Sequence, residues 1–288
     1  MIPFEIAEAR SLREAVEMLD PEDASVRAIA GGTALMLMMK AGLFRPTRLV
    51  SLRLVQGCSE IRCDADGGVR IGALTSLSTL EYSHDIQRLL PVIGSALRVL
   101  SNVRVRNVAT IGGSLAHGDP HMDLPPVLIA LGASVRVLGR RGERMIPVAD
   151  LLTGYFETQL AKDELISELL IPPQNGRQSA YLKCTTRAGH DWPTLGVAAS
   201  VAVDGDYVRE ATVVVGAATE RATRIDALRP LLVDRRPDAK LLRAAGEAAA
   251  TALADELQGS PAYKQQLVRV YVERVLRQAL KSDRGAFQ

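Results

Sequence analysis

The chain has 288 residues, 47% of them hydrophobic, and a formal net charge of +2 at pH 7. This length and apolar content suffice for a sizeable buried core and favour two domains over one. The charges are well mixed and aromatic residues make up only 4%, so the composition argues against a nucleic-acid-binding surface built from a basic patch and stacking aromatics.

The cysteines are Cys58, Cys63 and Cys184. They are too few for a disulfide framework and contain no C-x-x-C pair, which indicates a reducing compartment. The N-terminal stretch MIPFEIAEAR carries acidic residues early and lacks the apolar core of a signal peptide. No stretch approaches the roughly 20 uninterrupted apolar residues of a membrane helix. We therefore expect a cytoplasmic protein without a membrane span.

The first predicted helix covers residues 11–20, where apolar residues recur at helical spacing. Ser11 is its expected N-cap, and Glu14 completes a capping box. A short buried strand over residues 26–30 then leads into two glycines and an apolar helix that ends near Gly42.

Strands are predicted next over residues 47–55 and 68–74, with a turn at residues 66–68 before the second. A helix follows over residues 85–100, and Pro91 is expected to kink or interrupt it.

The remaining chain predicts a short helix leading into a strand within residues 125–139, and then a second, antiparallel sheet followed by two helices. The strands of that sheet are expected over residues 180–185, 196–205 and 210–217, and the helices over 239–257 and 262–281. The break between the halves falls in the proline- and glycine-containing linker of residues 172–179. Both halves therefore read as α+β.

Two double-glycine motifs stand out, Gly31–Gly32–Thr33 and Gly112–Gly113–Ser114. Each follows small apolar residues and ends on a hydroxyl. Paired glycines allow positive φ and leave no Cβ in the way of a ligand, so successive N–H groups can surround an anion. Two such motifs would accommodate the two phosphates of a dinucleotide, although a single Gly-Gly is more often an ordinary tight turn and the matching pair favours the two interpretations equally. Neither motif matches G-x-G-x-x-G or a P-loop.

The second motif opens the stretch TIGGSLAHGDPHMDLPP, residues 110–126, which also contains candidate ligands for a metal site. Its candidate ligands are His117, Asp119, His121 and Asp123. The histidines have the i, i+4 spacing that serves zinc on a helix. Pro120 between them breaks a helix, so surface histidines in a turn are the favoured interpretation.

Three stretches resemble the medium, FAD-binding subunit of the molybdenum hydroxylases, the family of aerobic carbon monoxide dehydrogenase and xanthine dehydrogenase-type flavoproteins. They are AIAGGTALMLMMK (28–40), NVATIGGSLAHGDPHMDLPPVLIALGA (107–133) and AYLKCTTRAGHDWPTLGVAASV (180–201), so the resemblance spans essentially the whole chain. The second stretch, with its T-I-G-G and D-P-x-x-D elements, is the most specific.

The resemblance implies an α+β fold with a two-part FAD-binding domain of the vanillyl-alcohol-oxidase/PCMH type and a smaller α+β C-terminal domain. The first would cover residues 1–175, as two α+β subdomains divided near residue 55, and the second residues 176–288, with an antiparallel sheet plus helices.

The resemblance also implies the residues that contact FAD. Two glycine loops would surround its pyrophosphate, and Asp123 would hydrogen-bond the cofactor. The backbone at Ile166 and the side chain of Lys183 would lie by the flavin ring, and Leu100 would line the pocket. The members of the loops are Ile29, Ala30, Gly31, Gly32, Thr33, Ala34, Leu35 and Met36 in the first, and Thr110, Ile111, Gly112, Gly113 and Ser114 in the second. Tyr181, Arg187 and Trp192 are further candidates for the surroundings of the ring.

Two positions depart from the family pattern, because Ser114 stands where Asn or Asp is common and Thr33 where some relatives carry His. Both keep a polar side chain. The three cysteines cannot supply the four ligands of the iron–sulfur cluster that some relatives carry in this subunit.

If it lies near the ring, as the resemblance implies, Lys183 would stabilise a negatively charged reduced flavin. Without the resemblance, the sequence favours a solvent-exposed strand lysine equally. The family implies an electron-transfer subunit, with no catalytic residue and no metal of its own. It would receive electrons from a small iron–sulfur subunit beside a large molybdenum-cofactor subunit, in a heterotrimer or a dimer of heterotrimers. Two alternatives stay open, a stand-alone flavoprotein oxidoreductase of the same fold and a flavin-free assembly or binding protein.

Overall fold

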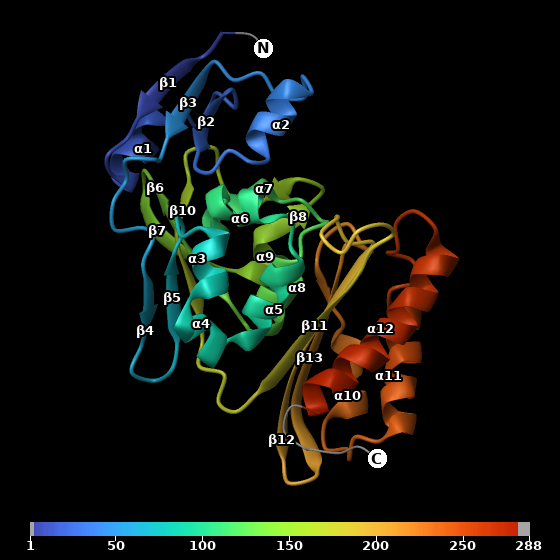
Figure 1. The fold of residues 1–288 in the computed structure, drawn as a ribbon. Coiled ribbons are helices and arrows are strands. Elements are labelled where there is room, and N and C mark those ends of the chain that lie inside the picture. Colours follow the sequence, from blue (N-terminus) through green and yellow to red (C-terminus); the bar gives the residue numbers. More distant parts are fainter. Residues whose placement is uncertain (1–2, 282–288) are drawn as a thin grey trace. The chain divides into compact units, whose positions relative to one another are not determined.

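The computed structural model describes residues 3–281 (Figure 1). The chain forms two compact units, each assembled from several segments. Unit 1 comprises the described residues of Met1–Tyr82, Asn102–Gly118 and Ala133–Pro172. Unit 2 comprises those of Ser83–Ser101, Asp119–Gly132 and Pro173–Gln288.

Unit 1 contains a small parallel sheet in the order β1–β3–β2. Its strands and the two helices that connect them are β1 (Glu5–Glu8), α1 (Leu12–Met18), β2 (Val26–Ile29), α2 (Leu35–Lys40) and β3 (Arg48–Ser51). Ser11 caps α1 as predicted, since its Oγ accepts from the Glu14 N–H at 3.1 Å. The Glu14 carboxylate reaches back one residue further than a capping box requires, to the N–H of Arg10.

A second sheet of unit 1 is antiparallel throughout, in the order β4–β5–β10–β6–β7. Its strands are β4 (Ile61–Cys63), β5 (Val69–Gly72), β6 (Ser134–Gly139), β7 (Gly142–Pro147) and β10 (Leu165–Ile171). The predicted turn at residues 66–68 joins β5 to β4, a strand that the sequence did not predict because only three residues form it.

Short helices and a two-stranded ribbon complete unit 1. They are α3 (Leu77–Tyr82), α6 (Val103–Val108), α7 (Ile111–His117), α9 (Val148–Leu151), β8 (Leu152–Gly154) and β9 (Glu157–Thr158). Inside this unit, Arg106 and Glu81 form a buried ion pair at 2.8 Å that joins α6 to α3. This ion pair fixes α6, the helix that precedes α7 in the chain, against α3.

Unit 2 is built on the second antiparallel sheet that the sequence predicts, in the order β11–β12–β13–β14. Its strands are β11 (Gln178–Cys184), β12 (Leu195–Asp204), β13 (Tyr207–Gly216) and β14 (Thr223–Arg224). The helices are α4 (His84–Leu89), α5 (Pro91–Val99), α8 (Leu124–Ala130), α10 (Arg229–Leu232), α11 (Ala239–Ala252) and α12 (Pro261–Lys281), with a 3-10 turn at Asp226–Leu228.

The helix predicted over residues 85–100 is two helices, because Pro91 is the first residue of α5 and cannot continue α4. The two C-terminal helices lie side by side (Figure 1) and share one apolar core with the sheet of unit 2. The mixed helices and antiparallel sheets confirm the α+β class.

The 14-residue helix α11 begins at a side-chain cap, because the Leu241 N–H donates to Asp238 Oδ1 at 2.7 Å. We expect Asp238→Ala to destabilise the protein by about 1 kcal/mol and Asp238→Ser to restore most of that loss. Urea unfolding followed by circular dichroism measures the effect. An unchanged midpoint for the alanine variant would show that this cap contributes nothing.

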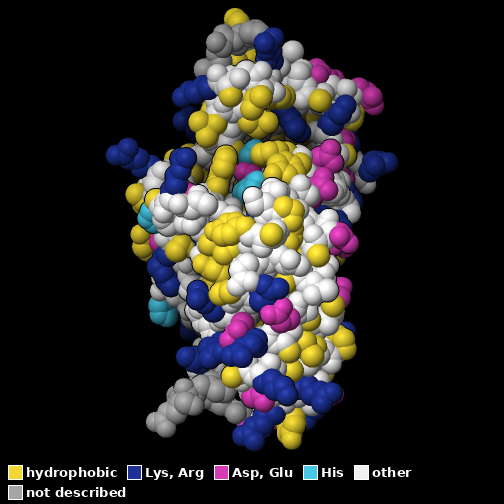
Figure 2. Space-filling view, turned by 90° about the vertical axis from the view of Figure 1, so that its right-hand side faces the viewer, with side chains coloured by type: hydrophobic (Ala, Val, Ile, Leu, Met, Phe, Trp, Pro, Cys, Tyr) yellow, Lys and Arg dark blue, Asp and Glu magenta, His cyan; other side chains and the backbone are white. Residues whose placement is uncertain are grey.

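On the face drawn in Figure 2, basic side chains are interspersed with acidic and apolar ones. This agrees with the near-neutral formal charge of +2. Within residues 3–281, no helix combines the length and apolar character needed to cross a membrane.

Candidate functional site: two glycine motifs and a buried ion pair

The first glycine motif connects β2 to α2 in unit 1. Gly32 has a φ of +68°, as the prediction of a glycine-specific turn requires. The Gly32 carbonyl accepts a hydrogen bond from the Met36 N–H in the first turn of α2, at 3.0 Å. Five successive N–H groups donate to nothing within residues 3–281, those of Gly31, Gly32, Thr33, Ala34 and Leu35. A run of unpaired N–H groups beside a positive-φ residue is the arrangement that binds phosphate oxygens in proteins.

The second glycine motif has a different structure. Gly112 and Gly113 are helical and lie in the first turn of α7, so the prediction of a second open loop is wrong. Thr110 is the N-cap, and its Oγ1 accepts from the Gly113 N–H at 3.1 Å. The N–H groups of Ile111, Gly112 and Ser114 donate at 3.0, 2.8 and 2.8 Å to the carbonyls of Thr75, Ala73 and Thr110. The backbone donors at 111–114 are thus already used within the protein.

The glycines at this second motif allow close packing. A Cβ on Gly112 would lie 2.6 Å from Ala73 Cβ, which is shorter than any ordinary contact. A Cβ on Gly113 would lie 2.9 Å from Thr110 Oγ1 and 3.8 Å from Ala30 Cβ. The physical reason for these glycines is therefore the space that neighbouring residues fill, rather than a positive φ.

The structure brings the two motifs together within unit 1. A Cβ on Gly31 would lie 2.0 Å from the carbonyl oxygen of Val108 and 2.9 Å from Ala109 Cα. The backbone just before α7 therefore packs directly on Gly31. The first motif supplies unpaired N–H donors, and the backbone that leads into the second motif packs against it.

Asp123 and Lys183 form an ion pair in unit 2, with 3.0 Å between Nζ and Oδ2 and both side chains only 5% exposed. Lys183 also donates to the Val99 carbonyl at 2.9 Å, which ties β11 to the end of α5. The Tyr181 hydroxyl donates to Asp123 Oδ1 at 2.7 Å. Lys183 is therefore a buried partner of Asp123, and the interpretation as a solvated strand lysine is wrong.

Burial raises the pKa of Asp123 above its ordinary value, against the opposing effects of Lys183 and of the Tyr181 hydrogen bond. Burial and, secondly, the adjacent Asp123 carboxylate raise the pKa of Tyr181 well above its usual range. Tyr181 therefore keeps its proton and acts as a hydrogen-bond donor at neutral pH.

The other predicted ring neighbours lie in different places. Ile166 is 6% exposed on β10, next to an irregularity in its pairing with β6. Leu100 is the half-buried C-cap residue of α5 in unit 2. Arg187 and Trp192 belong to an exposed loop between β11 and β12, and Trp192 is 72% exposed.

The histidines of the competing metal hypothesis each face an aromatic ring. His117 ends α7 and packs on Phe156 with 5.1 Å between ring centroids. His121 stacks on Trp192 at 6.5 Å and lies 3.5 Å from Asp119. The part of the chain described by the structure contains no group of three or more His, Cys, Asp or Glu side chains arranged to hold a metal ion.

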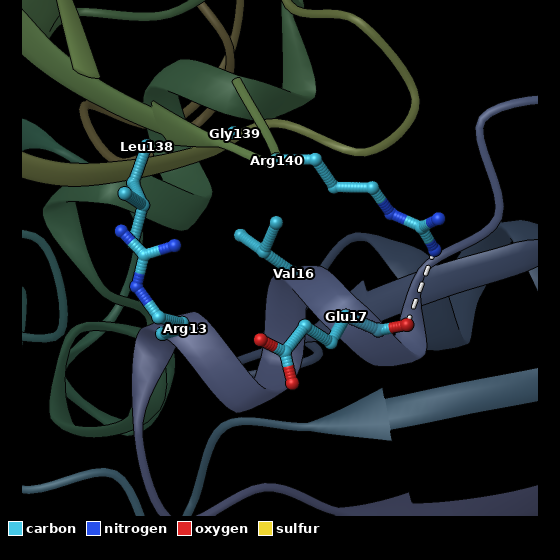
Figure 3. Close-up of a pocket in the computed structure, with 6 residues that line it drawn as sticks. All are labelled: Arg13, Val16, Glu17, Leu138, Gly139 and Arg140. Atoms are coloured by element: carbon cyan, nitrogen blue, oxygen red, sulfur yellow. Dashed lines mark hydrogen bonds between the residues drawn. The ribbon is translucent and has the colours of Figure 1, made fainter. Parts of the chain in front are cut away.

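A cavity of about 300 Å³ lies elsewhere in unit 1, between α1 and β6 (Figure 3). It is lined by Arg13, Val16, Glu17, Leu138, Gly139 and Arg140. Arg140 donates to the carbonyls of Glu17 and Leu19, so it satisfies the C-terminal end of α1. None of the residues predicted to contact FAD lines this cavity, and its visible role is structural.

The sequence did not predict two parts of the group around Asp123, Tyr181 and Lys183, namely the Val99 carbonyl and Gly196. A Cβ on Gly196 would lie 2.6 Å from the Tyr181 hydroxyl, so this glycine provides the space for that group. One sequence signal pointed to the pairing of Tyr181 with Lys183: they are two residues apart on a predicted strand, so their side chains lie on the same face.

The chain matches two families in succession. Residues 2–174 match the FAD binding domain in molybdopterin dehydrogenase, and residues 180–279 match the CO dehydrogenase flavoprotein C-terminal domain.

Individual relatives agree over nearly the full length. The chain is 34% identical to the 6-hydroxypseudooxynicotine dehydrogenase complex subunit alpha of Paenarthrobacter nicotinovorans, over 98% of this chain and 96% of that one. It is 31% identical to the carbon monoxide dehydrogenase medium chain of Hydrogenophaga pseudoflava, over 97% and 98%. The crystal structure of carbon monoxide dehydrogenase from that organism superposes with a TM-score of 0.91 at 31% identity, covering 97% of this chain and 99% of that one.

These matches confirm the resemblance and the cofactor that it implies. The chain belongs to the FAD-binding medium-subunit family of the molybdenum hydroxylases, and it is a flavoprotein oxidoreductase subunit whose cofactor is FAD.

Proposed function

We propose that the unpaired N–H groups of residues 31–35 bind the pyrophosphate of FAD. The observation that carries this proposal is the run of five backbone donors without a partner in residues 3–281, at a turn where Gly32 has positive φ. Phosphate oxygens supply acceptors for a run of N–H groups of this kind. Ile29, Ala30 and Met36 flank these donors and complete the first contact segment.

The second motif has a supporting role in this proposal. The N–H groups of residues 111–114 already donate to acceptors within unit 1, so Thr110, Ile111, Gly112, Gly113 and Ser114 contribute shape and side-chain contacts more than backbone donors. The family departure at Ser114 fits this role, because a short hydroxyl suffices where the backbone is already satisfied.

In unit 2, we propose that Asp123 and Lys183 contact the flavin end of the cofactor. A carboxylate only accepts, so Asp123 suits an N–H or hydroxyl of FAD. Lys183 has three N–H donors, and within residues 3–281 it uses two of them, on Asp123 and Val99. The third remains for a flavin acceptor atom. We also propose that the backbone at Ile166 lies by the flavin ring and that Leu100 lines the pocket.

The chain's proposed role is electron transfer between iron–sulfur clusters of a small partner subunit and an external acceptor, with substrate oxidation in a large molybdenum-cofactor subunit. When bound, FAD supplies the redox chemistry, while the chain positions it and tunes its surroundings. The named relatives support this role, since they are a subunit of a dehydrogenase complex and the medium chain of a carbon monoxide dehydrogenase. We propose a heterotrimer or a dimer of heterotrimers.

We also propose that residues 1–175 and 176–288 are the two sequence domains of this subunit, with the first divided near residue 55. None of the three cysteines forms a disulfide in the described chain, which supports the cytoplasm as its location.

The proposed phosphate site is tested by Gly32→Ala with Gly42→Ala as its control. Both glycines have positive φ, +68° and +74°, so alanine is strained at both, but Gly42 lies in open space beyond α2. We expect Gly32→Ala to weaken FAD binding about tenfold or more, because the turn that aligns the donors is lost. Gly42→Ala should bind FAD as the wild type does.

Fluorescence titration of the flavin-free chain with FAD and with FMN measures both affinities. We expect one FAD per chain, released by acid precipitation because it is bound non-covalently, and weaker binding of FMN. Equal binding by FMN, or by the Gly32→Ala variant, would contradict a pyrophosphate site at residues 31–35.

A further inference from the structure

The Tyr181 hydroxyl is a buried hydrogen-bond donor, and the pairing of β11 with β12 does not require its hydrogen bond. The residue is 6% exposed, and its O–H donates to Asp123 Oδ1 at 2.7 Å across 58 residues of sequence. A buried tyrosine often satisfies its hydroxyl on a nearby carbonyl. Here the acceptor is instead the carboxylate that we propose as a cofactor contact.

The two oxygens of Asp123 are held from two sides. Oδ1 accepts from Tyr181, and Oδ2 accepts from Lys183 at 3.0 Å. Because Lys183 is itself tied to the Val99 carbonyl at 2.9 Å, the carboxylate plane has little freedom to rotate. Charge-assisted hydrogen bonds of this kind are short and directional, so each one fixes an orientation as well as a distance.

The fold makes room for this hydroxyl at a specific position on the neighbouring strand. Gly196 pairs with Lys183 in the β11–β12 register. A Cβ at Gly196 would lie 2.6 Å from the Tyr181 hydroxyl and 3.2 Å from its ring. Any larger residue at 196 would displace the hydroxyl from Asp123.

We propose that Tyr181 is a positioning residue for FAD, which holds Asp123 and, through it, Lys183 in the orientation in which these two side chains contact the flavin. This inference rests on the proposed contacts of Asp123 and Lys183. Tyr181 acts through Asp123 and is not itself a catalytic residue. Gly196 belongs to the same arrangement because it provides the space for the hydroxyl.

Tyr181→Phe tests this directly, since it keeps the ring and removes one donor. We expect the affinity for FAD to fall about fivefold to tenfold, the loss expected when one charge-assisted hydrogen bond no longer orients a contact. The midpoint potential of the bound FAD should become more negative. Without the hydroxyl, Lys183 is drawn more fully onto Asp123 and less of its charge remains to stabilise the reduced flavin.

The potential is measured on the full chain at saturating FAD, so a variant that is merely less stable would leave it unchanged. Tyr207→Phe is the matched control, because Tyr207 lies on β13 of the same sheet, is 49% exposed, and makes no hydrogen bond through its hydroxyl within residues 3–281. Gly196→Ala, which displaces the hydroxyl sterically, should shift the potential in the same direction as Tyr181→Phe.

A double-mutant cycle with Asp123→Ala separates action through Asp123 from independent action. We expect Tyr181→Phe to change neither affinity nor potential once Asp123 is alanine. An undiminished effect in that background, or wild-type behaviour of the single Tyr181→Phe variant, would overturn the positioning role. If Asp123→Ala alone binds FAD like the wild type, the proposed cofactor contact itself fails, and that result is distinct from the first two.

Discussion

Gly31→Ala is expected to destabilise unit 1 and abolish FAD binding. Its Cβ would lie 2.0 Å from the Val108 carbonyl oxygen and 2.9 Å from Ala109 Cα. Both obstacles are backbone atoms, so no side-chain rotation relieves the overlap, and β2 must separate from the residues before α7. We expect a loss of about 3 kcal/mol, at the upper end of what overpacking costs in a close-packed interior.

Gly94→Ala makes the same chemical change in unit 2. Gly94 is a buried helical residue of α5 whose added Cβ would come no closer than 3.9 Å to another side chain. It should be neutral or stabilise by about 0.5–1 kcal/mol. Urea unfolding and FAD titration are run on both variants. Wild-type FAD affinity in Gly31→Ala would show that the two glycine motifs need not pack together.

Lys183→Met is expected to destabilise the protein by about 3–5 kcal/mol, because it leaves the buried Asp123 carboxylate without its cation. Both side chains of the pair are 5% exposed, so solvent does not replace the lost partner. Asp123→Asn combined with Lys183→Met should recover most of the loss, since a neutral amide still accepts from Tyr181 and no unpaired charge remains.

The loss in Lys183→Met should depend on pH. Burial already raises the pKa of Asp123, and Lys183 is the largest influence that lowers it, so removing Lys183 raises that pKa further. The native state then binds a proton that the unfolded chain, with a carboxyl pKa of about 3.9, has released. The free energy of unfolding of Lys183→Met, relative to that of the wild type, therefore falls as pH rises through the raised pKa of Asp123. The variant is closer in stability to the wild type at about pH 5 than at about pH 8. A deficit independent of pH, or one that the double variant retains in full, would contradict the assignment of a buried charge pair.

The sequence predicted the elements whose signals are local. The helical spacing of apolar residues in α11 and α12 and the runs of small and β-branched apolar residues in β12 and β13 each lie within one segment. The structure contains these elements close to the predicted positions. Pro91 likewise predicted the break between α4 and α5, because its effect on the backbone does not depend on neighbours.

Features that depend on distant parts of the chain were predicted less well. Gly112 and Gly113 read as a turn, yet they are helical because Thr110 caps them and the carbonyls of Ala73 and Thr75 accept from the first N–H groups of α7. The Asp123–Lys183 pair joins residues 60 positions apart, so nothing in either segment alone distinguishes a buried lysine from a solvated one. The family resemblance selected both residues, but only the structure gives the physical reason for their pairing.

We propose that this chain transfers electrons from a substrate only as a subunit of an assembly with molybdenum- and iron-containing partners. The direct measurement copurifies the assembly from its native host through a tag on this chain, identifies a substrate that it oxidises with dye reduction, and offers the same substrate to the isolated, FAD-loaded chain. We expect turnover by the assembly and none by the isolated chain, which should exchange electrons with reduced dyes or NADH at most slowly, through the flavin itself. Substrate-dependent dye reduction by the isolated chain, free of molybdenum and iron, would contradict the subunit role and establish a stand-alone flavoenzyme.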